Sequence, residues 1–399
     1  MRQIAERIKT IKEYINTKAL FRNNIVTGKL EYKSQIMQNF KEVDDYALNT
    51  MSVELADKNI RCGPSELKDI LMSHISPQYN PLTEFLNHLP EWDGKTDFIA
   101  ALASSVQTTN QAFWVRAFKK WIVALVGSMK IDNVINHTVI VLEGGQGIGK
   151  STWLYNLVPP ELKQFRYAGT IKISDKDTLI LLSEKVLIIL DELASLSLKG
   201  LNELKEIITK QDVQIRRPYG RFTESMPRRA SFAGSVNEKE LLNDPTGSRR
   251  FLCFTVKHQI NNNHQVDMKM VYAQALGLFI SGFQYWFDLN EMEEINKNNE
   301  QYRIKPIEEE YLLQTFEPAT KNQKCQYLTT SEILSDLNEM YKIPISNTSK
   351  MRLGKALKAN NFEAVKRNGR QLYIVRHVDK EKQGYLSQIP EIGNKQEFS

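Results

Sequence analysis

The chain contains few cysteines, and none stands near another. Cys62, Cys253 and Cys325 are the three cysteines among 399 residues, and no CxxC pair occurs. A zinc ribbon needs paired cysteines and a disulfide framework needs a clustered, even set, so both classes of protein are excluded. The six histidines are scattered as well, without zinc-ligand spacing. A reducing, cytoplasmic setting is therefore expected.

Long apolar runs and internal repeats are also lacking. No apolar run approaches the roughly 20 residues that a membrane span needs. The first residues, MRQIAERIKTIKEYI, predict an amphipathic helix and lack the apolar core of a signal peptide. The sequence contains no internal repeat of the kind that would indicate a solenoid. We therefore expect a protein without a membrane partner.

Neither sign of charge dominates the composition. Lys and Arg total 53 against 47 for Asp and Glu, which gives a formal net charge of +6. A mildly basic chain is compatible with a nucleic-acid partner without requiring one. Hydrophobic residues make up 41% of the sequence, enough for a sizeable core. The length suggests two to three domains.

The hydrophobic pattern changes along the chain. Two short strands are expected around Gly28, a connector at 79–99, and a helix with one buried face at 111–129. Strands then alternate with helices, which predicts an α/β core with a largely parallel sheet. Near the C-terminus two helices and a hairpin around Asn368-Gly369 predict a winged helix. The expected segments are 1–105, a mainly helical N-terminal region; 106–258, the core; 259–310, a helical lid or linker; 311–377, the winged-helix-like domain; and 378–399, a disordered tail.

A glycine-rich motif lies between a predicted strand and a predicted helix. Residues 144–151, GGQGIGKS, match G-x-x-x-x-G-K-[ST] without a mismatch. Glycines let backbone N–H groups wrap phosphates, and the following helix presents its positive end to the same anion. A glycine-rich turn that matches by chance is the alternative. The predicted nucleotide-binding residues are Gly144, Gly145, Gln146, Gly147, Ile148, Gly149, Lys150, Ser151 and Thr152.

An acidic pair follows the apolar run KVLIIL at 185–190. A continuous apolar run predicts a strand buried on both faces, and we expect it to neighbour the strand before the glycine-rich loop. Asp191 and Ser151 would hold Mg²⁺, and Glu192 would polarise the attacking water as the catalytic base. Lys150 would bind the β/γ-phosphates. Alternatively, the acids merely cap a helix that starts near Ser197.

Two further polar positions flank predicted strands. Asn237 ends the strand candidate ASFAGSV and could orient the water, unless it is simply a turn residue. Arg249 and Arg250 precede the strand candidate FLCFTV. An arginine from a neighbouring subunit could stabilise charge on the γ-phosphoryl group. The alternative for these arginines is a solvated pair on a surface loop.

A basic segment with interleaved aromatics, residues 204–229, lies between the acidic pair and Asn237. Its predicted hairpin could contact single-stranded DNA through arginine–phosphate contacts and aromatic stacking. The alternative is a solvated basic face. The candidate DNA-binding residues are Lys210, Arg216, Arg217, Tyr219 and Arg221.

Together these motifs resemble the virulence-associated protein E family of phages, plasmids and integrated elements. The resemblance spans roughly residues 77–256. It rests on GGQGIGKSTWL, VLIILDEL, LKEIITKQDVQIRRPYGR and RRASFAGSVNEKELLNDPTGSRRF, in that order.

The family resembles superfamily 3 helicases, which implies a P-loop NTPase (AAA+-like) core that uses ATP and Mg²⁺. It also implies a homo-oligomeric ring, expected to be a hexamer, that moves along single-stranded DNA. In that comparison Asn237 is the sensor, Arg249 or Arg250 is the arginine finger, and the basic segment contacts DNA.

The chain departs from related proteins that are fused to a primase. Its lead region is short, without cysteine ligands or a clustered acid triad, so a separate primase or initiator is expected. The sequence therefore predicts an ATP-dependent DNA helicase or translocase that acts in replication of a phage, plasmid or integrated mobile element. Two rivals remain: a non-translocating ATPase switch that gates a protein partner, and a DNA-binding initiator in which ATP is structural.

Overall fold

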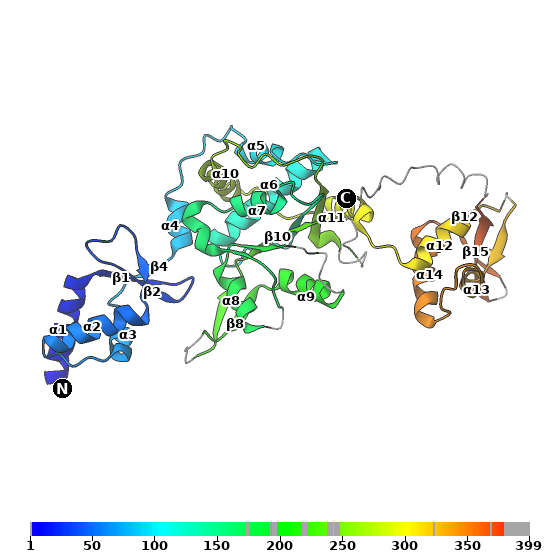
Figure 1. Ribbon diagram of the computed structural model, residues 1–399. Coiled ribbons are helices and arrows are strands. Elements are labelled where there is room, and N and C mark those ends of the chain that lie inside the picture. Colours follow the sequence, from blue (N-terminus) through cyan, green and yellow to red (C-terminus); the bar gives the residue numbers. More distant parts are fainter. Residues whose placement is uncertain are drawn as a thin grey trace, which may run out of the picture. The chain divides into compact units, whose positions relative to one another are not determined.

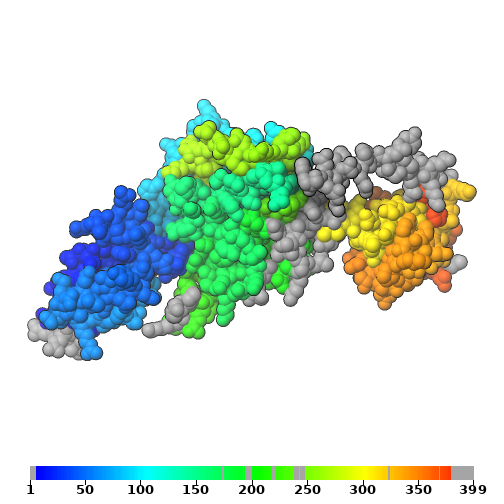
Figure 2. All heavy atoms as spheres, in the orientation of Figure 1, coloured from blue at the N-terminus to red at the C-terminus, as the bar shows by residue number. Residues whose placement is uncertain are grey.

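The structure is a computed structural model, drawn as a ribbon in Figure 1 and as spheres in Figure 2. The chain divides into two compact units, the first from Met1 to Arg303 and the second from Ile304 onward. No helix of the described residues is long and apolar enough to span a membrane. The expected tail, 378–399, lies outside the described residues except for Val378. The structure describes residues 2–172, 175–191, 193, 198–217, 222–237, 242, 248–321, 324–367 and 369–378.

A small mixed sheet lies in the N-terminal part of the first unit. The two strands expected around Gly28 are present and antiparallel, and Gly28 has the positive φ of 68° that favours glycine. Two strands of two residues each complete the order β3-β2-β1-β4. Such short strands cannot show a hydrophobic alternation, so they were not expected. The elements are α1 (Arg2–Lys18), β1 (Leu20–Asn24), β2 (Lys29–Lys33), β3 (Lys41–Glu42), α2 (Asp45–Asp57), α3 (Pro64–Leu71) and β4 (Gln78–Tyr79).

The predicted connector at 79–99 contains a helix, α4 (Pro81–Asn87). The Asn80 side chain accepts hydrogen bonds from the backbone N–H groups of Leu82 and Thr83, at 3.0 and 3.2 Å. Proline is tolerated at the first helical position because its missing N–H would have no partner there. Pro81 therefore begins a helix here, where the sequence pattern suggested an interruption.

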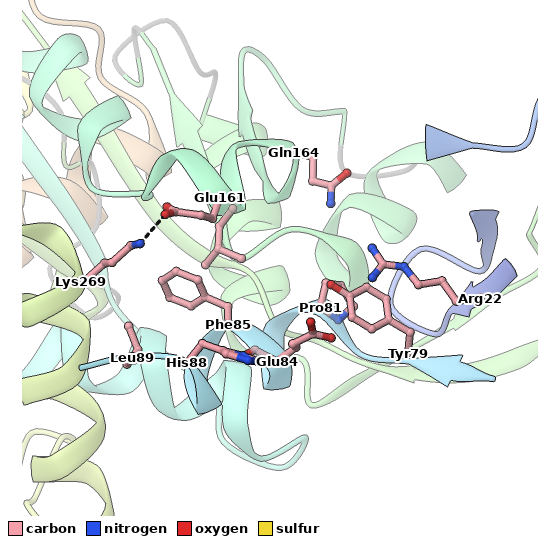
Figure 3. A pocket seen from close by; sticks show the side chains of 11 residues that line it. Arg22, Tyr79, Pro81, Glu84, Phe85, His88, Leu89, Glu161, Gln164 and Lys269 are labelled. Carbon is pink, nitrogen blue, oxygen red and sulfur yellow. Dashed lines mark hydrogen bonds and ion pairs between the residues drawn. The ribbon is translucent and has the colours of Figure 1, made fainter. Parts of the chain in front are cut away.

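The N-terminal sheet contacts the core beside a pocket of about 310 Å³ (Figure 3). The Arg22 guanidinium lies 3.8 Å from the ring centroid of Phe40 and 3.5 Å from that of Tyr79. On the core side of the pocket, Lys269 and Glu161 form an ion pair of 2.7 Å. Val26, in the turn after β1, is fully buried in the main core cluster. The N-terminal sheet is therefore anchored to the core through its β1–β2 turn.

A parallel five-stranded sheet forms the core of the first unit, which confirms the predicted α/β fold. The order is β11-β5-β10-β7-β6, and every pair is parallel. The strands are β5 (Val139–Glu143), β6 (Arg166–Ala168), β7 (Leu187–Leu190), β10 (Ser231–Val236) and β11 (Phe251–Thr255). The surrounding helices are α5 (Phe98–Ser104), α6 (Gln111–Lys130), α7 (Lys150–Asn156), α8 (Lys176–Glu184), α9 (Leu198–Thr209), α10 (Met268–Ile280) and α11 (Leu289–Asn299), with short 3₁₀ turns at Pro160–Phe165, Ser248–Arg250 and Glu300–Tyr302.

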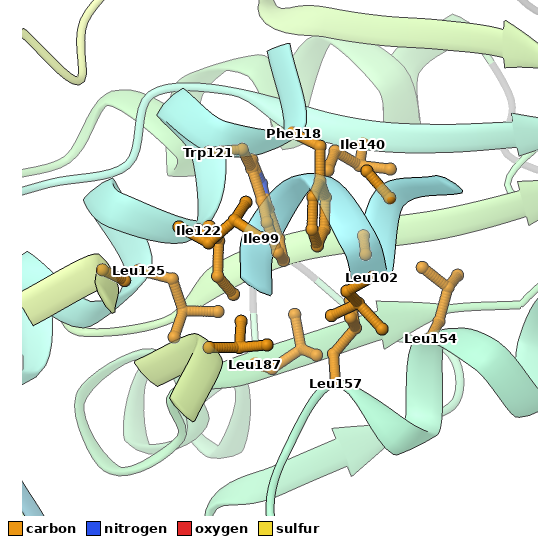
Figure 4. Packing of buried hydrophobic residues seen from close by; sticks show 14 of the residues in the cluster. Ile99, Leu102, Phe118, Trp121, Ile122, Leu125, Ile140, Leu154, Leu157 and Leu187 are labelled. Carbon is orange, nitrogen blue, oxygen red and sulfur yellow. The ribbon is translucent and has the colours of Figure 1, made fainter. Parts of the chain in front are cut away.

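Both faces of this sheet are covered by helices. Along β7, Leu187 and Ile189 join one hydrophobic cluster, and Ile188 and Leu190 join the other. Successive side chains of a strand point to opposite faces, so an all-apolar strand needs cover on both. The first cluster lies among α5, α6, α7 and α10 (Figure 4), and α10 borders α5 on the surface drawn in Figure 2. The predicted buried face of α6 is confirmed, since Trp114, Phe118, Trp121, Ile122 and Leu125 are all fully buried.

A two-stranded hairpin projects from the core between α9 and β10. It consists of β8 (Asp212–Ile215) and β9 (Glu224–Pro227), paired antiparallel. Arg228 and Arg229, which follow β9, are buried. Arg228 donates to the backbone oxygen of Asn136 at 3.2 Å, and burial lowers its pKa to about 9. Arg229 forms an ion pair of 2.9 Å with Asp132. These two arginines of the basic segment are therefore part of the core.

The second unit combines helices and a small sheet around its own core. The predicted pair of helices followed by a hairpin is confirmed, and a further helix and two short strands precede them. Met340 and Met351, which lie on these two helices, are 48% and 66% exposed. The elements are α12 (Ile307–Thr315), β12 (Phe316–Pro318), β13 (Gln326–Leu328), α13 (Thr330–Tyr341), α14 (Asn347–Ala359), β14 (Ala364–Arg367) and β15 (Arg370–His377).

Candidate nucleotide site

The glycine-rich loop connects the end of β5 to the start of α7. Gly144, Gly147 and Gly149 have φ values of 150°, 79° and 90°, which L side chains rarely adopt. A Cβ added to Gly149 would come within 2.4 Å of the Asn262 side-chain nitrogen, which donates to the Gly149 backbone oxygen at 3.1 Å. The loop conformation therefore depends on glycine at these positions, and a hydrogen bond from Asn262 stabilises it. Gly145, Gln146 and Thr152 are exposed, and Ile148 is half-buried.

Lys150 is buried, with 6% of its surface exposed. Its Nζ donates to the backbone oxygens of Gly144 and Gly145, the latter at 2.7 Å, and to Oδ1 of Asn237 at 3.2 Å. Burial lowers the pKa of Lys150, while the nearby Glu143 carboxylate opposes that shift. A buried ammonium group that is held by neutral oxygens favours an anion beside it. Lys150 and Asn237 are thus brought together as expected.

A serine hydroxyl and a carboxylate meet next to this lysine. Ser151 Oγ donates to Oδ1 of Asp191 at 2.9 Å and lies 3.3 Å from the Ser235 hydroxyl. The Tyr155 hydroxyl donates to Oδ2 of Asp191 at 2.6 Å, and this hydrogen bond to the carboxylate raises the pKa of Tyr155. Hydroxyl and carboxylate oxygens suit Mg²⁺. Glu192, the predicted base, lies outside the described residues.

Tyr155 and Ser235 were missed by the sequence reasoning. Tyr155 stands four residues after Ser151, so the two hydroxyls share one face of α7. That spacing was the available signal for Tyr155. Ser235 lies one residue before the end of β10, and no sequence pattern distinguished it from other strand residues.

The strand that carries Asp191 does not neighbour β5, contrary to expectation. β10 lies between β5 and β7, with Gly234 paired to both Val141 and Leu190. The carboxyl ends of parallel strands meet at one edge of a sheet, so the loop, Asn237 and Asp191 still converge. The sequence could not give this order, because β10 follows β7 along the chain.

Arg249 and Arg250 lie near the amino ends of the sheet strands, opposite the carboxyl ends where the glycine-rich loop lies. They precede β11, whose first residue, Phe251, is level with Val139 at the start of β5. A strand rises about 3.3 Å per residue, so five residues separate these arginines from the glycine-rich loop by more than ten ångströms. They line a pocket of about 400 Å³ together with His137 and Trp286. The chain therefore does not bring them into its own candidate site.

The basic segment divides into exposed and buried parts. Arg216 is exposed, and Lys210 is half-buried, with 38% of its side chain exposed. Arg217, in contrast, forms an ion pair of 3.0 Å with Glu184 and donates to the backbone oxygen of Val26 at 3.1 Å. Its side chain is only 15% exposed. The predicted role of Arg217 in contacting DNA is therefore replaced by a structural one, since it joins the hairpin to the N-terminal turn. Tyr219 and Arg221 lie outside the described residues.

Replacing Arg217 with alanine is expected to lower the free energy of unfolding by about 3 kcal/mol, since Glu184 loses the cation of a mostly buried pair. Burial raises the pKa of Glu184, and Arg217 opposes that rise. Without Arg217 the pKa of Glu184 should rise further. The loss of stability should then shrink as the pH falls through that pKa, because a protonated carboxyl needs no cation. Urea unfolding of the full chain at neutral and mildly acidic pH measures both effects.

The control for this substitution is Lys210→Ala, which removes a surface pair with Glu206. Such pairs contribute less than about 1 kcal/mol, so the control should unfold almost as the unaltered chain does. Equal losses for the two variants, or a loss independent of pH, would refute the structural role of Arg217.

Comparison with known proteins identifies two regions of the chain. The model of the virulence-associated protein E-like domain matches residues 86–304. A domain of unknown function described from a B. theta gene (DUF3874) matches residues 305–375. No curated protein matches the chain.

Two solved structures similar to this chain are apo structures of the NrS-1 C-terminal region, residues 305–718 in that protein's numbering. The first is 13% identical, with a TM-score of 0.48, and covers 92% of this chain and 98% of the other. The second is 12% identical, with a TM-score of 0.48, and covers 93% and 99%. The family model spans more than half of the chain and includes the parallel sheet, the glycine-rich loop and Asp191. The chain belongs to the virulence-associated protein E-like family.

Proposed function

We propose that this protein is an ATP-dependent DNA helicase or translocase that acts in replication of a phage, plasmid or integrated mobile element. The observation that carries the proposal is the meeting of Lys150, Asn237 and the Ser151–Asp191 pair at one edge of the sheet. Family membership supports nucleotide binding by this loop. The order β11-β5-β10-β7-β6, with a strand between the loop strand and the acid strand, supports an AAA+-like core.

The residues of the site fit a magnesium–ATP complex. The loop from Gly144 to Gly149 offers backbone N–H groups to phosphates, and Lys150 exchanges loop carbonyls for phosphate oxygens. Ser151 and Asp191 supply hard oxygen ligands, and the Tyr155 hydroxyl fixes the orientation of Asp191. When bound, Mg²⁺ neutralises charge on the phosphates.

The remaining roles follow from sequence and position. Glu192 accepts the proton of the attacking water, and Asn237 orients that water from the adjoining strand end. Arg249 or Arg250 acts on the nucleotide of a neighbouring subunit, which requires an oligomer, expected to be a hexameric ring. Both arginines lie near the amino ends of the strands, far from the glycine-rich loop of the same chain, and this position supports action between subunits. A separate primase or initiator is the proposed partner of this ATPase.

Single-stranded DNA is the proposed track of the motor. Lys210 precedes β8 at the base of the hairpin, and Arg216 follows β8 at the end where the chain turns. Tyr219 and Arg221, the other two candidates, lie outside the described residues. Cations bind phosphates and an aromatic ring stacks on bases, in both cases without sequence preference. The hairpin is therefore the proposed contact between the ATPase and DNA.

The test is ATP hydrolysis with and without a single-stranded oligonucleotide, for the unaltered chain and for Lys210→Ala/Arg216→Ala. Stimulation by DNA should fall about tenfold or more in the double variant, because two phosphate contacts are lost. Basal hydrolysis should stay unchanged.

Lys130→Ala/Lys163→Ala removes the same charge from exposed positions away from the hairpin and is the matched control. If DNA does not stimulate hydrolysis by the unaltered chain, the motor proposal is wrong. Stimulation that is equal in the hairpin and control variants removes the hairpin from it. Stimulation by a protein and not by DNA favours the switch, the alternative function.

A further inference from the structure

Charge is segregated within the second unit. Helices α12 and α13 contain acidic residues and no basic ones, whereas α14 and the β14–β15 hairpin contain basic residues and no acidic ones. The acidic set is Glu308, Glu309, Glu310, Glu332, Asp336 and Glu339. The basic set is Lys350, Arg352, Lys355, Lys358, Lys366, Arg367, Arg370 and Arg376. Arg352 pairs with the buried Glu308 at 3.7 Å, but α14 and the hairpin still contribute an excess of cations to the surface of the unit.

Helix α14 turns one face to the core and the other to solvent. Its buried residues are Ser349, Leu353, Ala356 and Leu357. The exposed face, opposite Leu353, carries Met351, Lys355 and Lys358. Lys355 and Lys358 form no ion pair with any described residue. Two exposed lysines therefore flank a methionine that is 66% exposed.

A half-buried glycine, Gly354, stands at the border between the two faces of α14. A mid-helix glycine costs about 1 kcal/mol relative to alanine, and a Cβ added to Gly354 would meet no atom within 4 Å. Nothing within the unit therefore requires glycine there. A small residue is useful where the helix backbone approaches a ligand closely.

The hairpin after α14 holds like charges opposite each other. Arg367 and Arg370 are cross-strand partners at the end of β14 and β15. Opposite like charges destabilise a hairpin. Neither arginine forms an ion pair of 4.0 Å or less with an acid among the described residues, although Arg370 lies near enough to Glu332 to interact with it electrostatically. The Arg367 guanidinium packs 4.0 Å from the ring centroid of Tyr327. An anion bound between the two arginines would remove the repulsion.

We propose that α14 and the β14–β15 hairpin form a binding site for duplex DNA, with α14 in the major groove and Arg367 and Arg370 on the phosphate backbone. The element order of the unit, a helix, strands, two helices and a hairpin, suits this placement of a recognition helix. Duplex is favoured over a single strand because stacking needs exposed aromatic rings. On α14 and the hairpin the single aromatic residue, Tyr373, is buried. This site is separate from the ATPase and does not rest on the proposed function.

The test measures binding of a fluorescently labelled duplex of about 20 base pairs to the full chain, with anisotropy read at several salt concentrations. The variants are Lys355→Gln/Lys358→Gln and Arg367→Gln/Arg370→Gln. Each should weaken duplex binding by about tenfold or more. The arginine variant should also reduce the slope of log K against log salt by about two, since each lost phosphate contact removes about 0.9.

Lys305→Gln/Lys342→Gln carries the same charge change on the acidic side of the unit and is the matched control. It should bind as the unaltered chain does, and all variants should keep basal ATP hydrolysis and thermal stability. Three results overturn the proposal: equal weakening in the control, unchanged duplex binding in both test variants, or an equal loss of affinity for a single strand of the same length.

Discussion

Lys150→Ala is expected to reduce kcat for ATP hydrolysis by about a thousandfold, the size of effect seen when a buried donor to the developing charge is removed. The ammonium group is buried and already held within reach of Gly145 and Asn237. Alanine leaves the loop glycines in place but removes the charge that faces the phosphates. Steady-state hydrolysis and the binding of a fluorescent ATP analogue measure the two consequences separately.

The control for this variant is Lys130→Ala, which removes an exposed lysine at the end of α6. It should hydrolyse ATP at the normal rate. A Lys150→Ala protein whose rate stays within tenfold of normal would show that the loop is not where hydrolysis occurs, and the nucleotide assignment would be withdrawn.

Loss of the correct arginine, Arg249 or Arg250, is expected to lower kcat by about a thousandfold or more, as arginine fingers do elsewhere. The other should matter little, so the two alanine variants are measured separately. The large effect arises although both arginines lie at the edge of the sheet far from the loop of their own chain. Under the proposed function the arginine acts on the nucleotide of a neighbouring subunit, and this gives the expected effect a distinctive signature.

That signature is complementation between two inactive proteins. When Lys150→Ala is mixed in equal amounts with the inactive arginine variant and subunits exchange, about one adjacent pair in four combines an intact loop with an intact arginine. Hydrolysis should therefore recover to about a quarter of normal. An arginine variant that stays active alone, or a mixture that exchanges subunits and stays inactive, would refute action between subunits.

The sequence predicted the local parts of this protein better than their assembly. GGQGIGKS specified loop, glycine conformations and lysine, because all of these depend on neighbours within eight residues. The order of the strands in the sheet could not be predicted from the sequence. All residues of β7 and β10 are buried, so the hydrophobic patterns of these strands do not indicate which strand lies beside which.

Long-range pairing explains the error at Arg217. In the sequence it is one cation in a basic run, but its partners are Glu184 on α8 and the backbone oxygen of Val26, far away along the chain. Arg228 and Arg229 illustrate the same limit, since composition cannot separate a buried guanidinium from a solvated one.

The path of the chain from the hairpin to Asn237 has a mechanical consequence. β9 leads through Arg228 and Arg229 straight into β10, whose six residues are all buried between β5 and β7. A strand bonded along both edges resists bending, because any bend breaks hydrogen bonds on both sides. We therefore expect a force along the hairpin to shift the Asn237 amide beside Lys150. We expect a shift of that amide to move the hairpin through the same strand. The proposed DNA contact and the proposed γ-phosphate sensor therefore share one stretch of backbone.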